Sequence, residues 1–464
     1  SIIMSPNDSF NTPRQPVKNA TVPFWHRDIH ELHDYRTTEE LPVSSDVVII
    51  GAGYAGVSTA YHLVKGEASD KELSITILEA RGACSGATGR NGGHLRPDMY
   101  TPMTRLIDRA GVERALEVTE FEIAHVHAIK SLIEKEKIDC DFTLTRSIDV
   151  WSNEETAQRA KEMYDKLASY DLEYMKDVFF VLGKDAEGVS GVKGAKACAS
   201  FTAATLWPYK LILHLTASIL ETGRVNLQTH TPVVSVTRQS SGSFVVTTPR
   251  GTTVARKVVY ANNAYVSGLL PQYREAIVPC KGLCTHISVP EGTRAPLLNN
   301  SYIVREEDDV VSYLIPRADG SIVVGGANLR YHYVLSSWYD NVDDSCLIEQ
   351  VKDHYDDYMQ RHFNGWEDSG ARVDKVWTGI MGYSWDSQPH VGAVPGEDGQ
   401  YVLAGFNGHG MPQAFLSALG VAKMVQNGIE FEDAGVPRLF QTTKDRLEKA
   451  KDGPLGGDIL GIKR

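Results

Sequence analysis

Residues 46–79 hold the feature that most restricts how this chain can fold: a buried strand, a glycine-rich turn, a helix and a second strand. The first strand is the apolar run Asp46 to Ile50, and the turn after it, Gly51-Ala52-Gly53-Tyr54-Ala55-Gly56, fits the spacing G-x-G-x-x-G. A helix is predicted from this turn through Val64, and the second strand runs from Ser74 to Leu78. A strand–helix–strand unit of this kind builds a parallel sheet.

The glycines and the acid after the second strand predict a dinucleotide cradle. Gly51 allows a tight turn, Gly53 lets the backbone approach a pyrophosphate, and Gly56 permits close packing of the helix on the strand. The helix start offers free N–H groups and the positive end of its dipole to the phosphates. Glu79 follows Leu78 and can accept ribose hydroxyls, whereas it would repel a 2′-phosphate, which argues against NADP. The motif itself leaves FAD and NAD open.

The rest of the chain predicts an α/β (α+β) fold in which the beginning and end are α/β-like and the middle is rich in strands. A Rossmann-like nucleotide-binding domain assembled from discontinuous segments is expected, with a mixed β-sheet substrate domain inserted. Helices are predicted over 341–363 and 412–427, and Phe24 and Trp25 are expected to anchor the N-terminal arm. The predicted boundaries are 1–44 for the arm; 45–103, 205–276 and 375–440 for the nucleotide-binding domain; 104–204 and 277–374 for the substrate domain; and 441–464 for a C-terminal tail.

Charge and hydropathy exclude several classes of protein. The formal net charge is -12, which argues against a nucleic-acid binder, and no apolar run is long enough to predict a membrane span. The six cysteines suit reduced thiols, and with no secretory signal recognised we expect a cytoplasmic protein. Cys280 and Cys284 have no second pair at ligand spacing, so no metal site is predicted. The oligomeric state stays open.

Two further segments distinguish FAD from NAD as the expected cofactor. One is EARGACSGATGRNGGH, from Glu79 to His94, and the other extends from Trp377 to Met411 and contains WTG, DSQPHVG and GFNGHGM. Both resemble the glycine oxidase, sarcosine oxidase and D-amino-acid oxidase superfamily of flavoproteins. The GRNGG run at 89–93 is most similar to the γ-glutamylputrescine-oxidase-like branch. The resemblance covers about residues 44 to 430 and implies FAD as the cofactor.

The resemblance also implies which residues hold FAD. Small residues in both segments let the backbone approach the cofactor, and a helix starting near Pro412 would aim its positive end at the flavin N1–C2=O edge. For Val233 and the loop Ala261-Asn262-Asn263-Ala264, ordinary strand ends are an equal alternative. The implied cofactor-binding residues are Gly51, Gly53, Ala55, Gly56, Glu79, Ala80, Arg81, Ser85, Ala87, Thr88, Arg90, Asn91, Gly92, Gly93, His94, Val233, Ala261, Asn262, Gly405, Gly408, His409, Gly410 and Met411.

The attachment of FAD is predicted to be non-covalent. Some relatives tether the flavin through a cysteine in the late segment, and the matching stretch from Gly379 to Tyr383 has none. Others use a histidine in the early loop, where this chain has Arg90, with His94 four residues later. Attachment through His94 therefore stays an alternative.

The catalytic candidates are His94, His409, Tyr383 and Trp385. Each histidine has a structural alternative, and the two aromatic residues, together with Tyr313 and Trp377, are expected to wall a substrate pocket.

Three other residues are expected to be structural or exposed. His390 is expected to pack and Arg317 to be structural. Lys281 is expected to be exposed to solvent, and the alternative, implied by relatives that have a lysine beside the flavin, is a role in the reaction with oxygen.

The resemblance implies oxidation of an amine C–N bond. The amine binds unprotonated with its α C–H over flavin N5, hydride transfer gives an imine, and oxygen reoxidises the flavin to yield hydrogen peroxide. Relatives that take amino acids clamp the carboxylate with an arginine near Ile380 to Gly382, where this chain has Met381. A simple amine is therefore expected, unless Arg96, Arg305 or Arg317 supplies the charge. The alternatives are an amino-acid or N-methyl amino-acid oxidase, a dehydrogenase with another acceptor, an NAD-dependent enzyme, and a flavoprotein without turnover.

Overall fold

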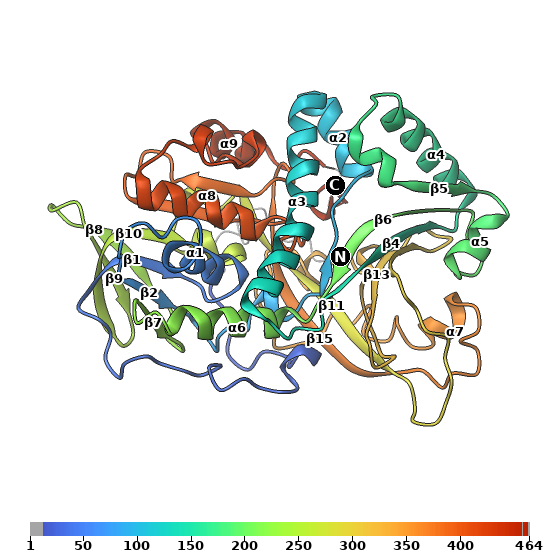
Figure 1. The fold of residues 1–464 in the computed structure, drawn as a ribbon, viewed down its shortest axis with the longest axis horizontal. Helices are drawn as coiled ribbons and strands as arrows, with labels where there is room; N and C mark the ends of the chain where they lie inside the picture. Colours follow the sequence, from blue (N-terminus) through green and yellow to red (C-terminus); the bar gives the residue numbers. More distant parts are fainter. Residues whose placement is uncertain (1–12, 457, 463–464) are drawn as a thin grey trace.

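The computed structural model describes residues 13–456 and 458–462, which form two β-sheets side by side with helices around and between them (Figure 1). The first residues of the predicted arm and the last two of the predicted tail lie outside the described residues. Both sheets combine strands from distant parts of the chain, and the predicted mixed α/β class is confirmed.

The first sheet contains the predicted strand–helix–strand unit. β1 lies between β2 and β10, and it is parallel to both, with Ile50 in register with Leu78 and with Tyr260. The loops after these three strands therefore emerge at one edge of the sheet. The strands, in spatial order, are β16 (His390–Ala393), β17 (Gln400–Ala404), β10 (Gly251–Tyr260), β1 (Ser44–Ile50), β2 (Ile75–Leu78) and β7 (Val225–Gln228), and the hairpin β8 (Ser235–Arg238) and β9 (Phe244–Thr248) continues from β10.

Helices α1 (Tyr54–Val64), α6 (Pro208–Leu220) and α8 (Ala414–Asn427) pack together on the first sheet (Figure 1). Every residue of α1 is buried, because the sheet and the other two helices surround it. This burial fixes the N-terminus of α1 at the sheet edge where the loops emerge.

The second sheet is mostly antiparallel. Its strands, in spatial order, are β15 (Arg372–Ser384), β11 (Ile277–Ser288), β14 (Ile322–Gly326), β13 (Val311–Pro316), β12 (Ser301–Arg305), β4 (Thr143–Trp151), β6 (Ala197–Thr205) and β3 (His94–Leu95), with β5 (Phe179–Leu182) beside β6. β15 pairs with β11 from Arg372 to Ser384, so a domain boundary at residue 375 would divide a continuous strand. We therefore treat all of β15 as part of the second sheet.

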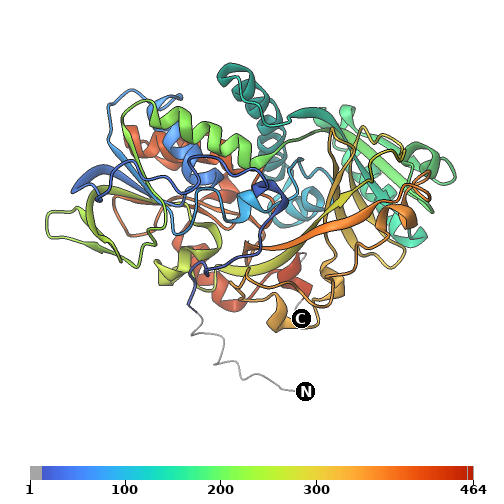
Figure 2. The same cartoon turned by 90° about the horizontal axis from the view of Figure 1, so that it is seen from below.

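The N-terminal arm runs along the outside of the first sheet before it enters β1 (dark blue in Figure 2). Arg36 pairs with Gln228 at the edge of β7. Phe24 and Trp25 are buried, and the Trp25 indole N–H donates to the carbonyl of Asn91 at 2.5 Å, so the predicted anchor is confirmed.

Two helix predictions are corrected. Within 341–363 only α7 (Tyr358–His362) is helical, because Asn341 and Asp343 accept the N–H groups of residues two positions on and form turns instead. The last long helix begins at Ala414 rather than Pro412. The other helices are α2 (Thr101–Ala110), α3 (Val112–Glu136), α4 (Glu154–Ala168), α5 (Asp185–Ser190), α9 (Lys444–Lys449) and α10 (Ile459–Ile462). Across the described ranges, none of the helices has the length and apolar character needed to span a membrane.

Candidate active site

A cavity of about 760 Å³ lies where the two sheets meet, and both sheets contribute to its walls. It extends from the loops at the edge of the first sheet to strands β11, β12, β13 and β15 of the second. The predicted site residues that line it are Gly51, Gly53, Ala55, Glu79, Ala80, Arg81, Ala87, Thr88, Arg90, Asn91, Gly92, His94, Val233, Ala261, Asn262, Tyr383, Gly408, His409, Gly410 and Met411. Gly56, Ser85, Gly93, Gly405 and Trp385 do not line it.

The glycine turn after β1 has no room for side chains. Gly51 has a φ of +113°, and a Cβ atom there would lie 2.5 Å from the carbonyl oxygen of Ala261. A Cβ atom on Gly56 would lie 1.9 Å from the carbonyl oxygen of Gly51, so this residue acts behind the turn by letting α1 approach β1. The geometry matches the roles predicted for these two glycines.

Glu79 is held at the end of β2 by its own neighbours. Its carboxylate accepts the backbone N–H of Ala52 at 2.9 Å and that of Arg81 at 3.2 Å. Burial raises the pKa of this carboxyl group, and the two N–H donors partly offset the effect. The carboxylate thus links the glycine turn to the loop after β2, and it faces the cavity beside Ala80.

The loop from Ser85 to Gly93 is held in place by hydrogen bonds within the loop and to α1 and β15. Thr88 accepts the backbone N–H of Tyr54 through its Oγ1 at 3.0 Å, which joins the loop to the start of α1. The buried guanidinium of Arg90 donates to the carbonyls of Ser85 at 2.7 Å and Thr378 at 2.9 Å. Arg90 therefore also ties the early segment to the late one.

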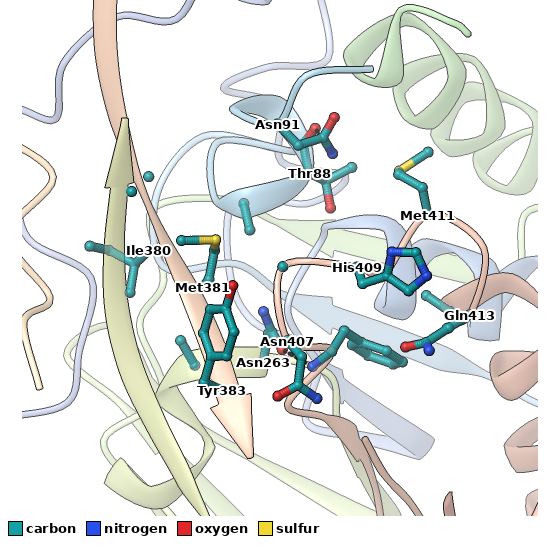
Figure 3. A pocket seen from close by; sticks show the side chains of 18 of the residues that line it. Thr88, Asn91, Asn263, Ile380, Met381, Tyr383, Asn407, His409, Met411 and Gln413 are labelled. Carbon is teal, nitrogen blue, oxygen red and sulfur yellow. Dashed lines mark hydrogen bonds between the residues drawn. The ribbon is translucent and has the colours of Figure 1, made fainter. Parts of the chain in front are cut away.

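The late segment returns to the same cavity through the turn from Gly405 to Met411. Asn263 accepts the N–H groups of Gly405 and Phe406 through its Oδ1, at 2.8 and 3.2 Å, and so positions the turn. Figure 3 shows Met381 and Tyr383 of β15 on one side of the pocket, with His409 and Met411 of the turn on the other.

These features fit a dinucleotide. The glycine turn leaves the backbone bare at the cavity, and the Asn262 Oδ1 is buried there without a hydrogen-bond partner in the described structure. Gln413, at the start of α8, likewise lines the cavity with an unpartnered Oε1. A bound cofactor can satisfy both groups.

His409 lies between two carboxylates. Its Nε2 makes a short hydrogen bond with Glu122 of α3 and lies 3.6 Å from Asp98. Burial alone would lower the pKa of His409, but Asp98 and Glu122 outweigh it and raise the pKa to about 9. The imidazole is therefore a cation at neutral pH.

Asp98 also begins a chain of alternating charges along the second sheet. Arg96 donates to Asp98, and its other nitrogen donates to both oxygens of Asp149 at 2.8 Å. Arg305 lies 4.0 Å from Asp149, and its Nη1 is buried without a hydrogen-bond partner among the described residues. The two terminal nitrogens of Arg96 thus bind carboxylates, and its Nε is buried without a hydrogen-bond partner among the described residues. The nearest carboxylate to Arg305, that of Asp149, lies 4.0 Å away.

His94 is a neutral residue of the same wall. Its Nε2 lies 2.6 Å from the Ser301 Oγ. Burial, with the charges of Arg96 and His409, moves the pKa of His94 well below its usual value. At neutral pH His409 is thus a cation, whereas His94 is uncharged.

The aromatic lining differs from the prediction. Tyr313, Tyr383 and the unpredicted Tyr331 line the cavity, whereas Trp377 and Trp385 do not. The Trp377 indole instead donates to the carbonyl of Arg90 at 2.8 Å. Trp385 packs in an apolar cluster under the first sheet, so its side chain is not placed to contact a substrate.

Burial and hydrogen-bond partners test the predictions for His390, Arg317 and Lys281. His390 is buried against Thr442 and Arg317 pairs with Asp141 at 3.0 Å, as structural residues do. Lys281 was expected to be exposed, and this is wrong: it is 2% exposed, because β15 and the segment before α7 cover β11.

Two residues of the site, Asp98 and Glu122, were not predicted from the sequence. Glu122 carries a detectable signal, since it is an acid on the buried face of the amphipathic helix α3. Asp98 lies in an irregular segment where no spacing rule marks it. Among residues 13–456 and 458–462, no cluster of three metal-ligating side chains occurs.

The family described as FAD dependent oxidoreductase matches residues 46–424. The γ-glutamylputrescine oxidoreductase of Escherichia coli (strain K12) is 24% identical over 403 residues, covering 84% of this chain and 86% of that protein. The glycine oxidase of Geobacillus kaustophilus (strain HTA426) is 24% identical over 399 residues, covering 82% and 93%. The L-proline dehydrogenase structure from P. horikoshii has a TM-score of 0.66 at 20% identity, covering 86% and 98%. The predicted superfamily, its FAD cofactor and the Rossmann-like fold are confirmed.

Proposed function

The chain belongs to the FAD-dependent oxidoreductase family, and from this premise we propose that it oxidises the C–N bond of an amine. Bound FAD supplies the hydride acceptor at flavin N5. We propose molecular oxygen as the final acceptor, with an imine and hydrogen peroxide as products. Relatives named for γ-glutamylputrescine and for glycine support a substrate with an oxidisable C–N bond.

The observation that carries this proposal is the continuity of one cavity from the dinucleotide cradle to a pocket with apolar and aromatic walls. Met381 lines this pocket at the place where amino-acid-oxidising relatives are expected to have an arginine, and Ile380 lies beside it. Tyr313 and Tyr383 add aromatic surface. An amine carbon chain is compatible with these walls, whereas an unpaired carboxylate there would be costly.

His409 supplies a fixed positive charge in this pocket. Because Glu122 and Asp98 hold the imidazolium, it does not depend on the substrate for its protonation. We propose that this imidazolium stabilises the negative charge that develops on reduction. The Tyr383 hydroxyl makes no hydrogen bond within the described structure, so it is free to bind the substrate nitrogen.

A second candidate function is oxidation of an amino acid or N-methyl amino acid. Arg305 favours it, since this residue lines the cavity and its Nη1 makes no hydrogen bond in the described structure, with the Asp149 carboxylate 4.0 Å away. Arg96 favours it less, because Asp98 and Asp149 bind both of its terminal nitrogens and leave only the buried Nε. The two candidates thus differ in whether Arg305 meets an anionic group of the substrate.

The test is anaerobic bleaching of the flavin by a panel of amines and their α-carboxylated analogues, followed by admission of air. Amines that bleach faster, with rapid reoxidation and peroxide release, support the proposal. Slow reoxidation would point to a dehydrogenase, and bleaching by no compound would point to a flavoprotein without turnover. If the carboxylated analogues bleach the flavin about tenfold faster than the amines, which corresponds to roughly 1.4 kcal/mol in transition-state binding, the second candidate function replaces the first.

Arg305→Met then separates the two candidates, with Arg256→Met as the control because Arg256 is 83% exposed. Loss of preference for the carboxylate in the Arg305 variant alone would identify the clamp. Unchanged preference in both variants would exclude Arg305 from substrate binding.

A further inference from the structure

Lys281 is a buried cation whose hydrogen-bond partner is a thiol. It lies on β11, is 2% exposed, and its Nζ donates to the Cys346 Sγ at 3.1 Å. Within the described part of the chain, no carboxylate forms a salt bridge with this ammonium group. A buried ammonium requires a partner, and a thiolate would satisfy it better than a neutral thiol does.

Cys346 is also the exposed cysteine of the chain. The other five are buried, and burial raises the pKa of the thiols of Cys84, Cys140, Cys198 and Cys284. A reagent in solvent therefore meets Cys346 first. Its thiol also donates to the Asp343 carboxylate at 3.4 Å, so the sulfur lies between Lys281 and Asp343.

The segment that carries Cys346 is held in place beside Lys281. The Thr378 hydroxyl donates to the carbonyl of Cys346 at 2.9 Å. The neighbouring Asp344 is fully buried and binds the Arg81 guanidinium through both oxygens, at 2.9 and 3.0 Å. The Lys281–Cys346 contact is therefore part of a fixed arrangement rather than a chance approach of two surface side chains.

We propose that Cys346 is a peroxide-reactive modification site activated by Lys281. The Cys346 thiolate attacks one oxygen of hydrogen peroxide, the O–O bond breaks, and the sulfur becomes a sulfenic acid. The departing hydroxide takes a proton from the Lys281 ammonium and leaves as water, and solvent then returns that proton. A local source of peroxide rests on the proposed oxidase function, but the reactivity of the pair does not.

The experiment adds reagent hydrogen peroxide to the FAD-loaded protein without any amine, in the presence of dimedone, and maps the adduct by mass spectrometry. We expect one adduct, on Cys346, and none in Cys346→Ser. Lys281→Met should form the adduct about tenfold more slowly, while Lys281→Arg, which keeps the cation, should stay closer to wild type. No adduct in the wild type, an adduct mainly on another cysteine, or an unchanged rate in Lys281→Met would overturn the proposal.

A second arm keeps the proposal testable if Lys281→Met does not fold. At one fixed pH, iodoacetamide should label Cys346 about tenfold faster in the folded wild-type protein than in the same chain unfolded in urea, because only the folded protein places Lys281 beside the thiol. An equal or slower rate in the folded protein would show that Lys281 does not activate the thiol. Neither arm uses an amine substrate, so failure here and failure of the proposed oxidase activity are distinguishable.

Discussion

Replacing His409 with glutamine removes the cation that lies between Asp98 and Glu122. The carboxylates raise the pKa of His409 from 6.5 to about 9 in the folded protein, so its contribution to stability is fully present below pH 6.5 and is lost as pH rises through about 9. Linkage over that interval gives His409 protonation a contribution to the free energy of unfolding of at most about 2.5 kcal/mol at pH 7 and almost nothing at about pH 10. The His409 side chain is 24% exposed, so most of this contribution survives solvent screening.

The assay is denaturant unfolding of FAD-saturated wild type and His409→Gln at the two pH values. Effects of the substitution on packing are the same at both, so the diagnostic quantity is the difference in destabilisation between them. His390→Gln is the matched control: burial lowers the pKa of His390, which is neutral at both values, and its cost should not change with pH. Equal destabilisation by His409→Gln at both pH values would refute the charged arrangement.

The remaining predictions concern the cofactor and the pocket. The protein should carry one FAD per chain, and acid precipitation should leave a colourless pellet; a yellow pellet would show covalent attachment, with His94 the first position to examine. Gly56→Ala should lower the free energy of unfolding by about 1–3 kcal/mol through overpacking, and it should also lower the FAD content. Gly188→Ala is the control, because a Cβ atom there meets nothing within 4 Å, and it should change neither stability nor FAD content. Tyr383→Phe should lower kcat/KM for an amine about tenfold if its hydroxyl binds the substrate nitrogen, because a lost hydrogen bond is worth about 1.4 kcal/mol, while Trp385→Phe should change kcat/KM little.

The nucleotide end of the cavity could be predicted because local backbone geometry specifies it. Gly51 and Gly56 are needed wherever a helix must follow a strand this closely, and Glu79 follows from the end of the next parallel strand. Each signal lies within a short stretch of sequence. The loop from Ser85 to Gly93 was likewise recognised as one continuous motif.

The substrate end could not be predicted in the same way, since its contacts join residues far apart in sequence. Asp98 precedes α2, Glu122 lies on α3, and His409 lies before α8, so their meeting depends on how the two sheets pack. The aromatic prediction failed at Trp385 for a related reason. Tyr383 and Trp385 are two residues apart, so on a continuous strand both side chains would point to the same face. β15 ends at Ser384, however, and the chain then turns Trp385 into the core under the first sheet.

Lys281 was expected to be exposed to solvent, and packing of neighbouring segments on β11 buries it instead. As a lysine near the entry to a strand, it was expected to reach solvent, yet β15 pairs along β11 and the segment before α7 covers it. That segment was predicted to be a helix, whereas Asn341 and Asp343 turn it back so that Cys346 meets Lys281. Both failed predictions therefore depend on how this segment packs. The side chains of Asn341 and Asp343 form turns where a helix was predicted, and the same segment, together with β15, covers Lys281.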